Sequence, residues 1–395
     1  MVMVSITADN RDVERSLQRN IKLAEKTGAE FSDDLLLKCV DGDLSLEAPP
    51  DSTGKVLIRL PRDCLVPLKS FHFSVADDNI VVSSHDEGLT NSCLARMEAI
   101  LELYNLTNKF ARHRRQSPWL LIASHPRLQQ YVMQRRSGVA SEYGKFIDSG
   151  AQNELMLRGF LNTRTYTSQV DSTEAPRVPV LMPVLDLMNH HIYGAPFREE
   201  TENRSLTMSR SVPRPGTGNE CFACYGPYDA FETWITYNFV DGRVPFVTSV
   251  AMTIDLPGLG TIRLANFHKP RFKKDLPDSV KYLWAYIPQL LVKGKHHIDT
   301  ASLLIPGHRA PKALRQTLRF LISEISPEHS QQSDLVLHAE NQIIAANNTY
   351  YQNLKACLLA LLPTDPLQKP ILDEFIRLCE LQLARIQVYA ACAEG

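Results

Sequence analysis

The stretch PVLDLMNHH (183–191) begins as an apolar run and ends in polar side chains. Asp186, Asn189 and His190 therefore stand where the surrounding hydrophobicity predicts the protein interior. A buried polar group without a partner costs roughly 1–3 kcal/mol, so each of the three should have one. The partner is either another group of the same chain or a bound ligand, and this stretch alone leaves both alternatives open.

A metal site is the other chemistry that the residue types suggest. Cys221-x-x-Cys224 is the only close pair among the eight cysteines, and a zinc half-site needs a second pair. The stretch is also typical of a strand, in which residues 221 and 224 would point to opposite faces. The doublets His190-His191 and His296-His297 lack further ligands at metal spacing. We therefore expect no metal site.

Composition narrows the class of protein. The chain has 395 residues, 44% of them hydrophobic and 22% charged, which is typical of a soluble globular protein of two or three domains. Its net charge of −1 gives no electrostatic reason to expect a nucleic-acid partner. The N-terminus lacks the pattern of a usual signal peptide, so we expect none, and no uncharged stretch approaches the ~18–20 apolar residues that span a bilayer. The scattered cysteines suit a reduced compartment, so we expect a cytoplasmic or otherwise intracellular protein without a membrane partner.

The elements that must position these residues begin with a helix. Residues 9–27 predict a polar amphipathic helix, which Gly28 ends. From Asn91 to about Phe160 the apolar residues again follow a helical period, as in Leu94, Met97, Leu101 and Tyr104. Between the two helical regions, turn signals separate short expected strands at 35–40, 44–48, 55–61 and 79–84.

Strands return after a break at 172–179, and the chain is expected to be helical from Pro277 onward. The expected strands of this second group are VLMPVL, ECFACY, TWITYNFV, PFVTSVAMTI and TIRLANF. The layout is strand-rich, with a helical insert, further strands and an all-helical tail. We therefore expect an α+β protein, since the strands are too short and too irregularly joined for a doubly wound sheet.

Three stretches in order resemble one protein family. They are TRTYTS (163–168), PVLDLMNHH and CYGPYDAFETWITYNFV (224–240). They are similar to S/T-R-x-F, D-x-x-N-H and Y-G-x-x-S/D-N-x-x-L-L-x-x-Y-G-F of SET-domain protein methyltransferases, in the branch of the Rubisco large-subunit lysine methyltransferase. DLSLEAPPDSTGKVLIRLP (43–61) also resembles the first SET segment of that branch, so the resemblance covers nearly the whole chain.

The resemblance implies a fold and a domain order. An N-terminal helix within 1–30 would precede a SET-domain β-fold of short strands with a knot-like core at 31–272. A helical insert at about 91–165 would split that domain. An all-α, substrate-binding-like domain would follow at 273–395 and dock a protein substrate, whose identity the sequence does not give.

The resemblance also implies S-adenosyl-L-methionine (AdoMet) as cofactor, with S-adenosyl-L-homocysteine as product. Main-chain groups of Asn189 and His190 would bond the adenine, and the Asn189 side chain would bond the methionyl end. Asp186 would brace their turn. Arg164 would hold the cofactor carboxylate, because a guanidinium can bond both of its oxygens.

Tyr237 and Tyr225 resemble the tyrosines that serve the reaction in this family. Tyr237 would be the catalytic tyrosine, and Tyr225 would form a wall of the acceptor channel. Methyl transfer to an amine requires a neutral nitrogen, so the channel must depress the pKa of a lysine from about 10.4. A tyrosine ring can line such a channel while its hydroxyl orients the nitrogen.

The chain departs from the family pattern in four places, one of which is the absence from PFVTSVAMTI of a tyrosine that some relatives carry. The cofactor loop, where Asp43 and Leu44 would contact the cofactor, keeps only Gly42 of the usual G-x-G. In the third motif, Ala230 replaces Asn and Asn238 replaces Gly. The expected function is an AdoMet-dependent protein-lysine N-methyltransferase, with a histidine acceptor as a variant. The departures keep a non-catalytic, SET-like protein-interaction module as the rival.

Overall fold

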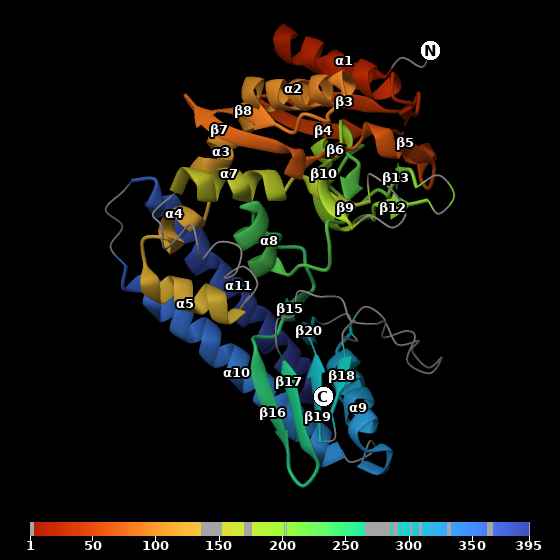
Figure 1. Cartoon of the computed structure of the whole chain (residues 1–395). Coiled ribbons are helices and arrows are strands. Elements are labelled where there is room, and N and C mark those ends of the chain that lie inside the picture. Colours follow the sequence, from red (N-terminus) through yellow and green to blue (C-terminus); the bar gives the residue numbers. More distant parts are fainter. Residues whose placement is uncertain are drawn as a thin grey trace. The chain divides into compact units, whose positions relative to one another are not determined.

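The structure, a computed structural model, describes residues 4–135, 152–169, 176–200, 202, 204–264, 286, 291–294, 296–300, 302–307, 310–329, 333–361 and 366–394. These residues form short strands and helices in alternation, so the expected α+β class is confirmed (Figure 1).

The chain divides into two compact units. The first unit comprises Met1–Gln116 and Asn153–Pro227, and the second comprises Ser117–Gln152 and Tyr228–Gly395. The helical insert expected at 91–165 is thus shared between the units, and residues 228–272 group with the tail. The expected boundary at residue 272 lies outside the described residues, and the three-domain scheme stays a prediction.

The first unit contains small sheets rather than one continuous sheet. Two sheets of three strands have the pairing orders β1 (Ser5–Ala8), β3 (Leu36–Val40), β4 (Asp43–Glu47) and β6 (Val66–Pro67), β10 (Val178–Leu181), β9 (Thr165–Ser168). One sheet of four strands has the order β12 (Arg198–Glu199), β13 (Leu206–Ser209), β5 (Val56–Leu60), β2 (Glu30–Phe31). Two pairs of strands are β7 (Phe71–Ala76) with β8 (Asn79–His85), and β11 (Asn189–Ala195) with β14 (Phe222–Ala223). Its helices are α1 (Arg11–Glu25), α2 (Asn91–Leu106), α3 (Lys109–Gln116) and α7 (Gln152–Asn162).

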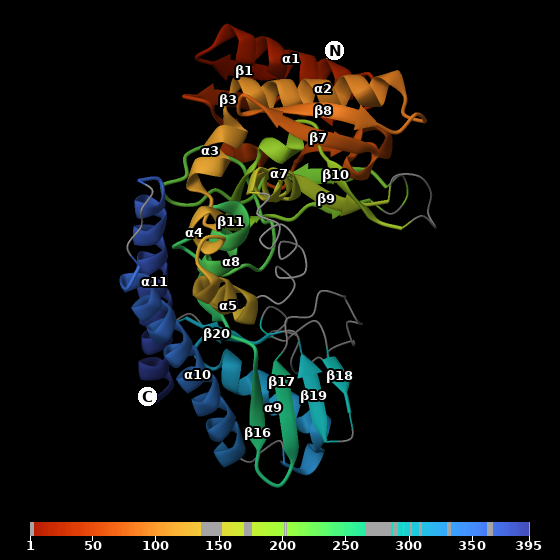
Figure 2. The same ribbon diagram turned by 60° about the vertical axis from the view of Figure 1, so that its left-hand side comes forward.

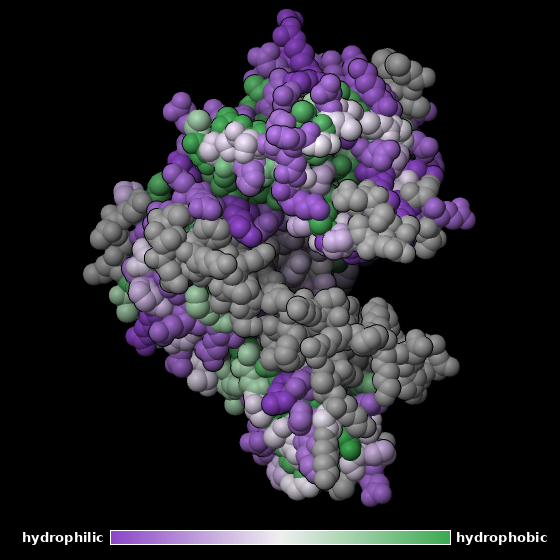
Figure 3. Space-filling model, viewed as in Figure 1, coloured by the Kyte–Doolittle hydropathy of each residue, from purple (hydrophilic) through white to green (hydrophobic). Residues whose placement is uncertain are grey.

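Helix α1 confirms the amphipathic helix expected at 9–27. The Asn10 side chain caps its first turn by accepting from the main-chain N–H of Asp12 at 2.8 Å. The chain leaves the helix through Gly28, whose φ of +89° favours glycine. The apolar face of α1 is buried at positions that include Leu17, and α1 lies beside α2 over the strands (Figures 1 and 2). Hydrophilic residues predominate on its outer side (Figure 3).

The segment 219–223 runs close to two strands of the first unit. The N–H of Cys221 donates to the Leu46 carbonyl of β4 at 2.7 Å, and Ala223 pairs in parallel with His190 of β11. A Cβ on Gly194 would lie 2.5 Å from the Ala223 carbonyl carbon, so only glycine permits this approach. This close passage brings β4, β11 and β14 together, and the knot-like core stays a prediction.

The second unit combines helices with two further sheets. In pairing order, its strands are β16 (Met252–Leu256), β17 (Gly260–Leu264), β19 (His297–Thr300) and β18 (Leu291–Lys293), and then β15 (Phe246–Thr248) and β20 (Leu304–Pro306). Its helices are α4 (Trp119–Ile122), α5 (Pro126–Arg135), α8 (Ala230–Tyr237), α9 (Ala313–Ile325), α10 (Ser333–Leu359) and α11 (Gln368–Glu394). The long helices α10 and α11 lie side by side (Figure 2).

The expectation of an all-helical tail is wrong for residues 291–306. Strand β19 pairs with β17 and β18, and β20 pairs with β15. These strands have only three or four residues each, too few to show an alternating pattern in the sequence. Their pairing partners, and not their own composition, make them strands.

The expected strand TWITYNFV is also wrong, because most of it lies in helix α8. A capping box begins the helix: the Asp229 side chain accepts from the Glu232 N–H, and the Glu232 side chain accepts from the Asp229 N–H. Asn238 ends the helix with a φ of +65°. Asparagine is among the few residues other than glycine that adopt this conformation readily, so it can replace the glycine of the motif.

Candidate functional site

Asp186 lies in a short 3-10 turn, Leu185–Leu187, at the end of the buried run. Its carboxylate accepts a hydrogen bond from the hydroxyl of Tyr104, which is fully buried on α2. The partner of Asp186 is therefore part of the chain. Sequence reasoning identified Tyr104 as a core position of a helix, and helical periodicity gave no signal that its hydroxyl faces a carboxylate.

Arg164 follows helix α7 and precedes β9. Its guanidinium carbon lies 5.3 Å from the centre of the Phe160 ring. Its Nε is buried and has no hydrogen-bond partner among the described residues, and none of their carboxylates lies within ion-pair distance of the guanidinium. The side chain is half-buried and has no counter-charge among these residues, so the arrangement suits an anion that is not part of them.

Lys109 adds a second cation to the same environment. It is buried at the first position of α3, and burial, followed by the nearby Arg164, lowers its pKa to about 7. Burial also raises the pKa of Asp186, although the Tyr104 hydrogen bond and Arg164 favour its charged form. His113 stays neutral because burial, and then Arg164, lowers its pKa to about 3. Lys109 and Arg164 thus both act electrostatically on Asp186. Sequence reasoning missed Lys109, since nothing in the pattern distinguishes it from a surface lysine.

Asn189 and His190 begin strand β11. The Asn189 amide donates to the Leu44 carbonyl at 3.3 Å and to Glu220 Oε1 at 2.7 Å, which leaves its side-chain oxygen as the acceptor. His190 is buried, and its Nδ1 accepts from the main-chain N–H of Tyr225 at 3.1 Å. These contacts connect the D-x-x-N-H stretch to the expected cofactor loop and to the third motif. Glu220 has no equivalent in the motifs and was missed.

The expected cofactor loop is held by an arginine of α3. Arg112 Nη1 lies 2.5 Å from Asp43 Oδ1, and Nη2 donates to the Gly42 carbonyl at 2.5 Å. Gly42 has a φ of +76°, and a Cβ there would lie 2.9 Å from the Thr107 carbonyl oxygen. The conformation of this loop therefore requires the one glycine that the chain keeps. Because Asp43 already pairs with Arg112, this aspartate has a structural contact that the sequence did not predict.

Tyr225 completes the group of predicted residues in the first unit. Its ring centre lies 5.0 Å from that of His190, and its hydroxyl donates to the Met188 carbonyl. Burial raises its pKa to about 12, with Arg164 opposing, so the hydroxyl is protonated at neutral pH. The structure thus connects Tyr225, His190, Asn189 and Leu44 by direct contacts, and places Arg164 where it acts electrostatically on Asp186 and Tyr225.

Tyr237 belongs to the second unit, where it is the last residue of α8. Its ring centre lies 5.8 Å from that of Tyr228 and 6.2 Å from that of Phe239. The structure therefore places two aromatic side chains of its own unit near Tyr237.

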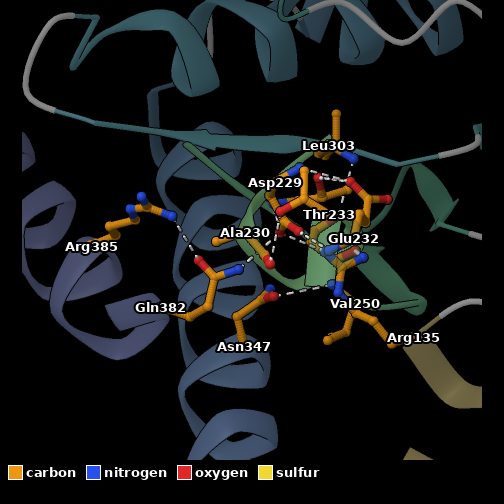
Figure 4. Close-up of polar contacts among 12 residues, drawn as sticks. Arg135, Asp229, Ala230, Glu232, Thr233, Val250, Leu303, Asn347, Gln382 and Arg385 are labelled. Carbon is orange, nitrogen blue, oxygen red and sulfur yellow. Dashed lines mark hydrogen bonds and ion pairs between the residues drawn. The ribbon is translucent and has the colours of Figure 1, made fainter. Parts of the chain in front are cut away.

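The start of α8 is fixed by a buried ion pair. Arg135 Nη2 lies 2.8 Å from Asp229 Oδ2, and neither side chain is exposed. The same carboxylate accepts from the Thr248 N–H at 2.9 Å and from Gln382 at 3.1 Å (Figure 4). Ala230, which replaces the asparagine of the motif, is fully buried directly after this carboxylate. The network holds the helix that ends in Tyr237.

Two features concern metals and membranes. In the part of the chain that the structure describes, no three His, Cys, Asp or Glu side chains gather as a metal site would require. The described helices include none with the length and apolar character needed to cross a bilayer.

Comparisons with known proteins give similarity at the level of solved structures. No protein-family model and no curated protein matches the chain. The chain is similar to the SET domain of LSMT bound to lysine and AdoHcy, with 12% identity over 96% of this chain and 91% of that one, and a TM-score of 0.41. Rubisco LSMT bound to AdoMet gives 14% identity, the same coverages and a TM-score of 0.40. Rubisco LSMT bound to sinefungin and monomethyllysine gives 13% identity, again with these coverages and a TM-score of 0.40. Similarity at this level assigns neither a family nor a ligand.

Proposed function

We propose that this protein is an AdoMet-dependent protein methyltransferase whose acceptor is a lysine side chain. The observation that carries the proposal is Arg164, a guanidinium with a buried Nε and no carboxylate partner among the described residues. It acts electrostatically on Asp186 and Tyr225, and Tyr225 contacts the Asn189-His190 stretch. A ligand that carries a carboxylate suits this position, since it would supply the missing anion.

The residues of the first unit suit the two ends of AdoMet. When bound, AdoMet supplies an electrophilic methyl group on a sulfonium. Arg164 would hold the carboxylate, with Lys109 as a second cation nearby. The Asn189 oxygen, which is the acceptor left on that amide, would accept from the ammonium group. Main-chain groups of Asn189 and His190 would bond the adenine.

The chain's contribution to the reaction would be orientation and exclusion of water. Tyr225, whose hydroxyl is protonated and bonded to the Met188 carbonyl, would be a fixed wall of the acceptor channel. Tyr237 is proposed as the tyrosine that orients the acceptor nitrogen, on the spacing of the third motif alone. A protein substrate would dock on the tail. A histidine acceptor would likewise need to be oriented and shielded from water by the chain.

The test measures AdoMet binding and methyl transfer separately. Tyr237→Phe should bind AdoMet like the parent and lower single-turnover methyl transfer by roughly 30–1000-fold, because a hydroxyl used mainly in the transition state is worth about 2–4 kcal/mol. Tyr228→Phe, on the neighbouring ring, is the matched control and should retain activity.

If Tyr237→Phe turns over as fast as the control Tyr228→Phe, Tyr237 is a packing residue. Absence of AdoMet binding by the parent at millimolar concentration would refute the enzyme and leave the non-catalytic interaction module.

A further inference from the structure

The first unit contains a pocket of about 300 Å³ that shares no residue with the proposed cofactor site. Its wall combines the far end of β11, the strand β13 with the turn after it, and the loop before β5. The lining residues are Thr53, Gly54, Tyr193, Gly194, Ala195, Pro196, Arg198, Ser209, Arg210, Ser211, Val212 and Arg214.

The pocket has a one-sided charge. Three of its lining residues, Arg198, Arg210 and Arg214, are arginines, and none is acidic. No carboxylate of the described residues lies within ion-pair distance of the three guanidinium groups. The acids next to Arg198 in sequence are engaged elsewhere: Glu199 pairs with Arg177 at 2.5 Å, and Glu200 pairs with Arg59 at 3.2 Å.

Arg210 is the informative member, because it is only 2% exposed. Its Nη1 donates to the Glu220 carbonyl at 2.6 Å and lies 3.3 Å from Cys221 Sγ, whereas its Nε and Nη2 have no hydrogen-bond partner among the described residues. A guanidinium buried without a carboxylate costs several kcal/mol, and an anion nearby would reduce that cost. The two other arginines are exposed, and Arg214 lies 4.7 Å above the Tyr193 ring.

We infer that this pocket binds a small organic anion carrying phosphate or carboxylate groups. Its volume lies at the small end of the range of ligand sites, which suits such a ligand. Arginine forks recognise phosphate and carboxylate oxygens in pairs, and the hydroxyls of Ser209 and Ser211 are additional donors in the wall. The site is independent of the proposed methyltransferase function.

The test titrates the full chain with pyrophosphate and, separately, with citrate by calorimetry at low ionic strength. At least one of the two should bind saturably, and added salt should weaken that binding. Binding of pyrophosphate alone identifies a phosphate ligand, and binding of citrate alone identifies a carboxylate ligand.

The variants locate the binding. The double variant Arg198→Gln/Arg214→Gln should lose about tenfold or more in affinity, the effect of removing charged hydrogen bonds. Arg11→Gln/Arg15→Gln removes the same charge from exposed positions on α1 and should bind like the parent. Failure of both probes to bind saturably, or an equal loss in the two double variants, would overturn the inference.

Discussion

Two arginines, one in each unit, differ in whether the chain supplies them with a carboxylate partner. Arg135, the last residue of α5, is fully buried against Asp229, donates to the Ser249 carbonyl at 3.2 Å and lies 5.6 Å from the Phe231 ring. Arg164, just after α7, has a ring beside it as well, but no carboxylate among the described residues.

The difference lies in what the rest of the chain supplies. Burial alone would lower the pKa of Arg135, but Tyr351 and Asp229 outweigh it, so that pKa is raised. Beside Arg164, by contrast, burial and then the charge of Arg164 lower the pKa of Lys109. A buried ion pair belongs to the fold, whereas a half-buried cation without a carboxylate partner suits a ligand.

The largest effect on stability is expected at Arg135, the arginine with a carboxylate partner. Arg135→Ala should lower the free energy of unfolding by about 3–5 kcal/mol, because it leaves the Asp229 carboxylate buried without its counter-charge. Denaturant unfolding monitored by circular dichroism measures it. Arg127→Ala, at an exposed position of the same helix, is the control and should change stability by less than about 0.5 kcal/mol. Equal losses of stability in Arg135→Ala and Arg127→Ala would show that the Arg135–Asp229 ion pair does not stabilise the second unit.

An intermediate effect is expected at Tyr104. Tyr104→Phe removes the hydroxyl that donates to Asp186 and should lower the free energy of unfolding by about 1–3 kcal/mol. Chemical unfolding of Tyr104→Phe and of the double variant Tyr104→Phe/Asp186→Asn measures it. The second substitution removes the buried charge and should recover part of the loss. A Tyr104→Phe protein as stable as the parent would show that the buried carboxylate does not depend on this contact.

An effect that depends on pH follows from the titration of Lys109. Its pKa is about 7 in the folded protein and 10.5 in the reference state, so between these values the unfolded chain binds more protons. The free energy of unfolding should therefore rise with pH in this window, by at most about 1.4 kcal/mol per unit, and Lys109 should contribute no slope below pH 7. Lys109→Met should flatten this rise in unfolding curves taken at each pH. An unchanged slope in the variant would place the titration elsewhere.

The smallest effect on stability is expected at Arg164. Arg164→Met removes a cation without a carboxylate partner and keeps an apolar side chain beside Phe160, so the free energy of unfolding should change by less than about 1 kcal/mol. Thermal and denaturant unfolding in the absence of AdoMet are the measurements. A loss as large as that of Arg135→Ala would mean that Arg164 has a structural partner, which would remove the contrast between the two arginines.

The sequence predicted the parts that depend on local patterns. Helix α1 and the strands near residues 36–60 follow directly from periodicity and turn residues. The polar residues of PVLDLMNHH pointed to a site because their type conflicts with their surroundings. The contacts of Asn189 with Leu44, and of His190 with Tyr225, agree with the order of the motifs.

The rest depends on pairings between distant residues, which no local pattern encodes. Tyr104 bonds Asp186 across 82 positions, and Arg135 bonds Asp229 across 94. Tyr237 was expected on a strand because its stretch is rich in aromatic and β-branched residues, yet the capping box at Asp229 makes it helical. The strands at 291–306 likewise form through their partners.

The central claim is that Arg164 binds the carboxylate of AdoMet. The most direct test compares the binding affinities of AdoMet and decarboxylated AdoMet. Calorimetry of both ligands with the parent and with Arg164→Met forms a double-mutant cycle. The parent should prefer AdoMet by roughly 10–150-fold, the value of a hydrogen bond to a charged group, and Arg164→Met should lose most of that preference. An equal preference in the two proteins would contradict the claim and place the carboxylate, if it binds, away from Arg164.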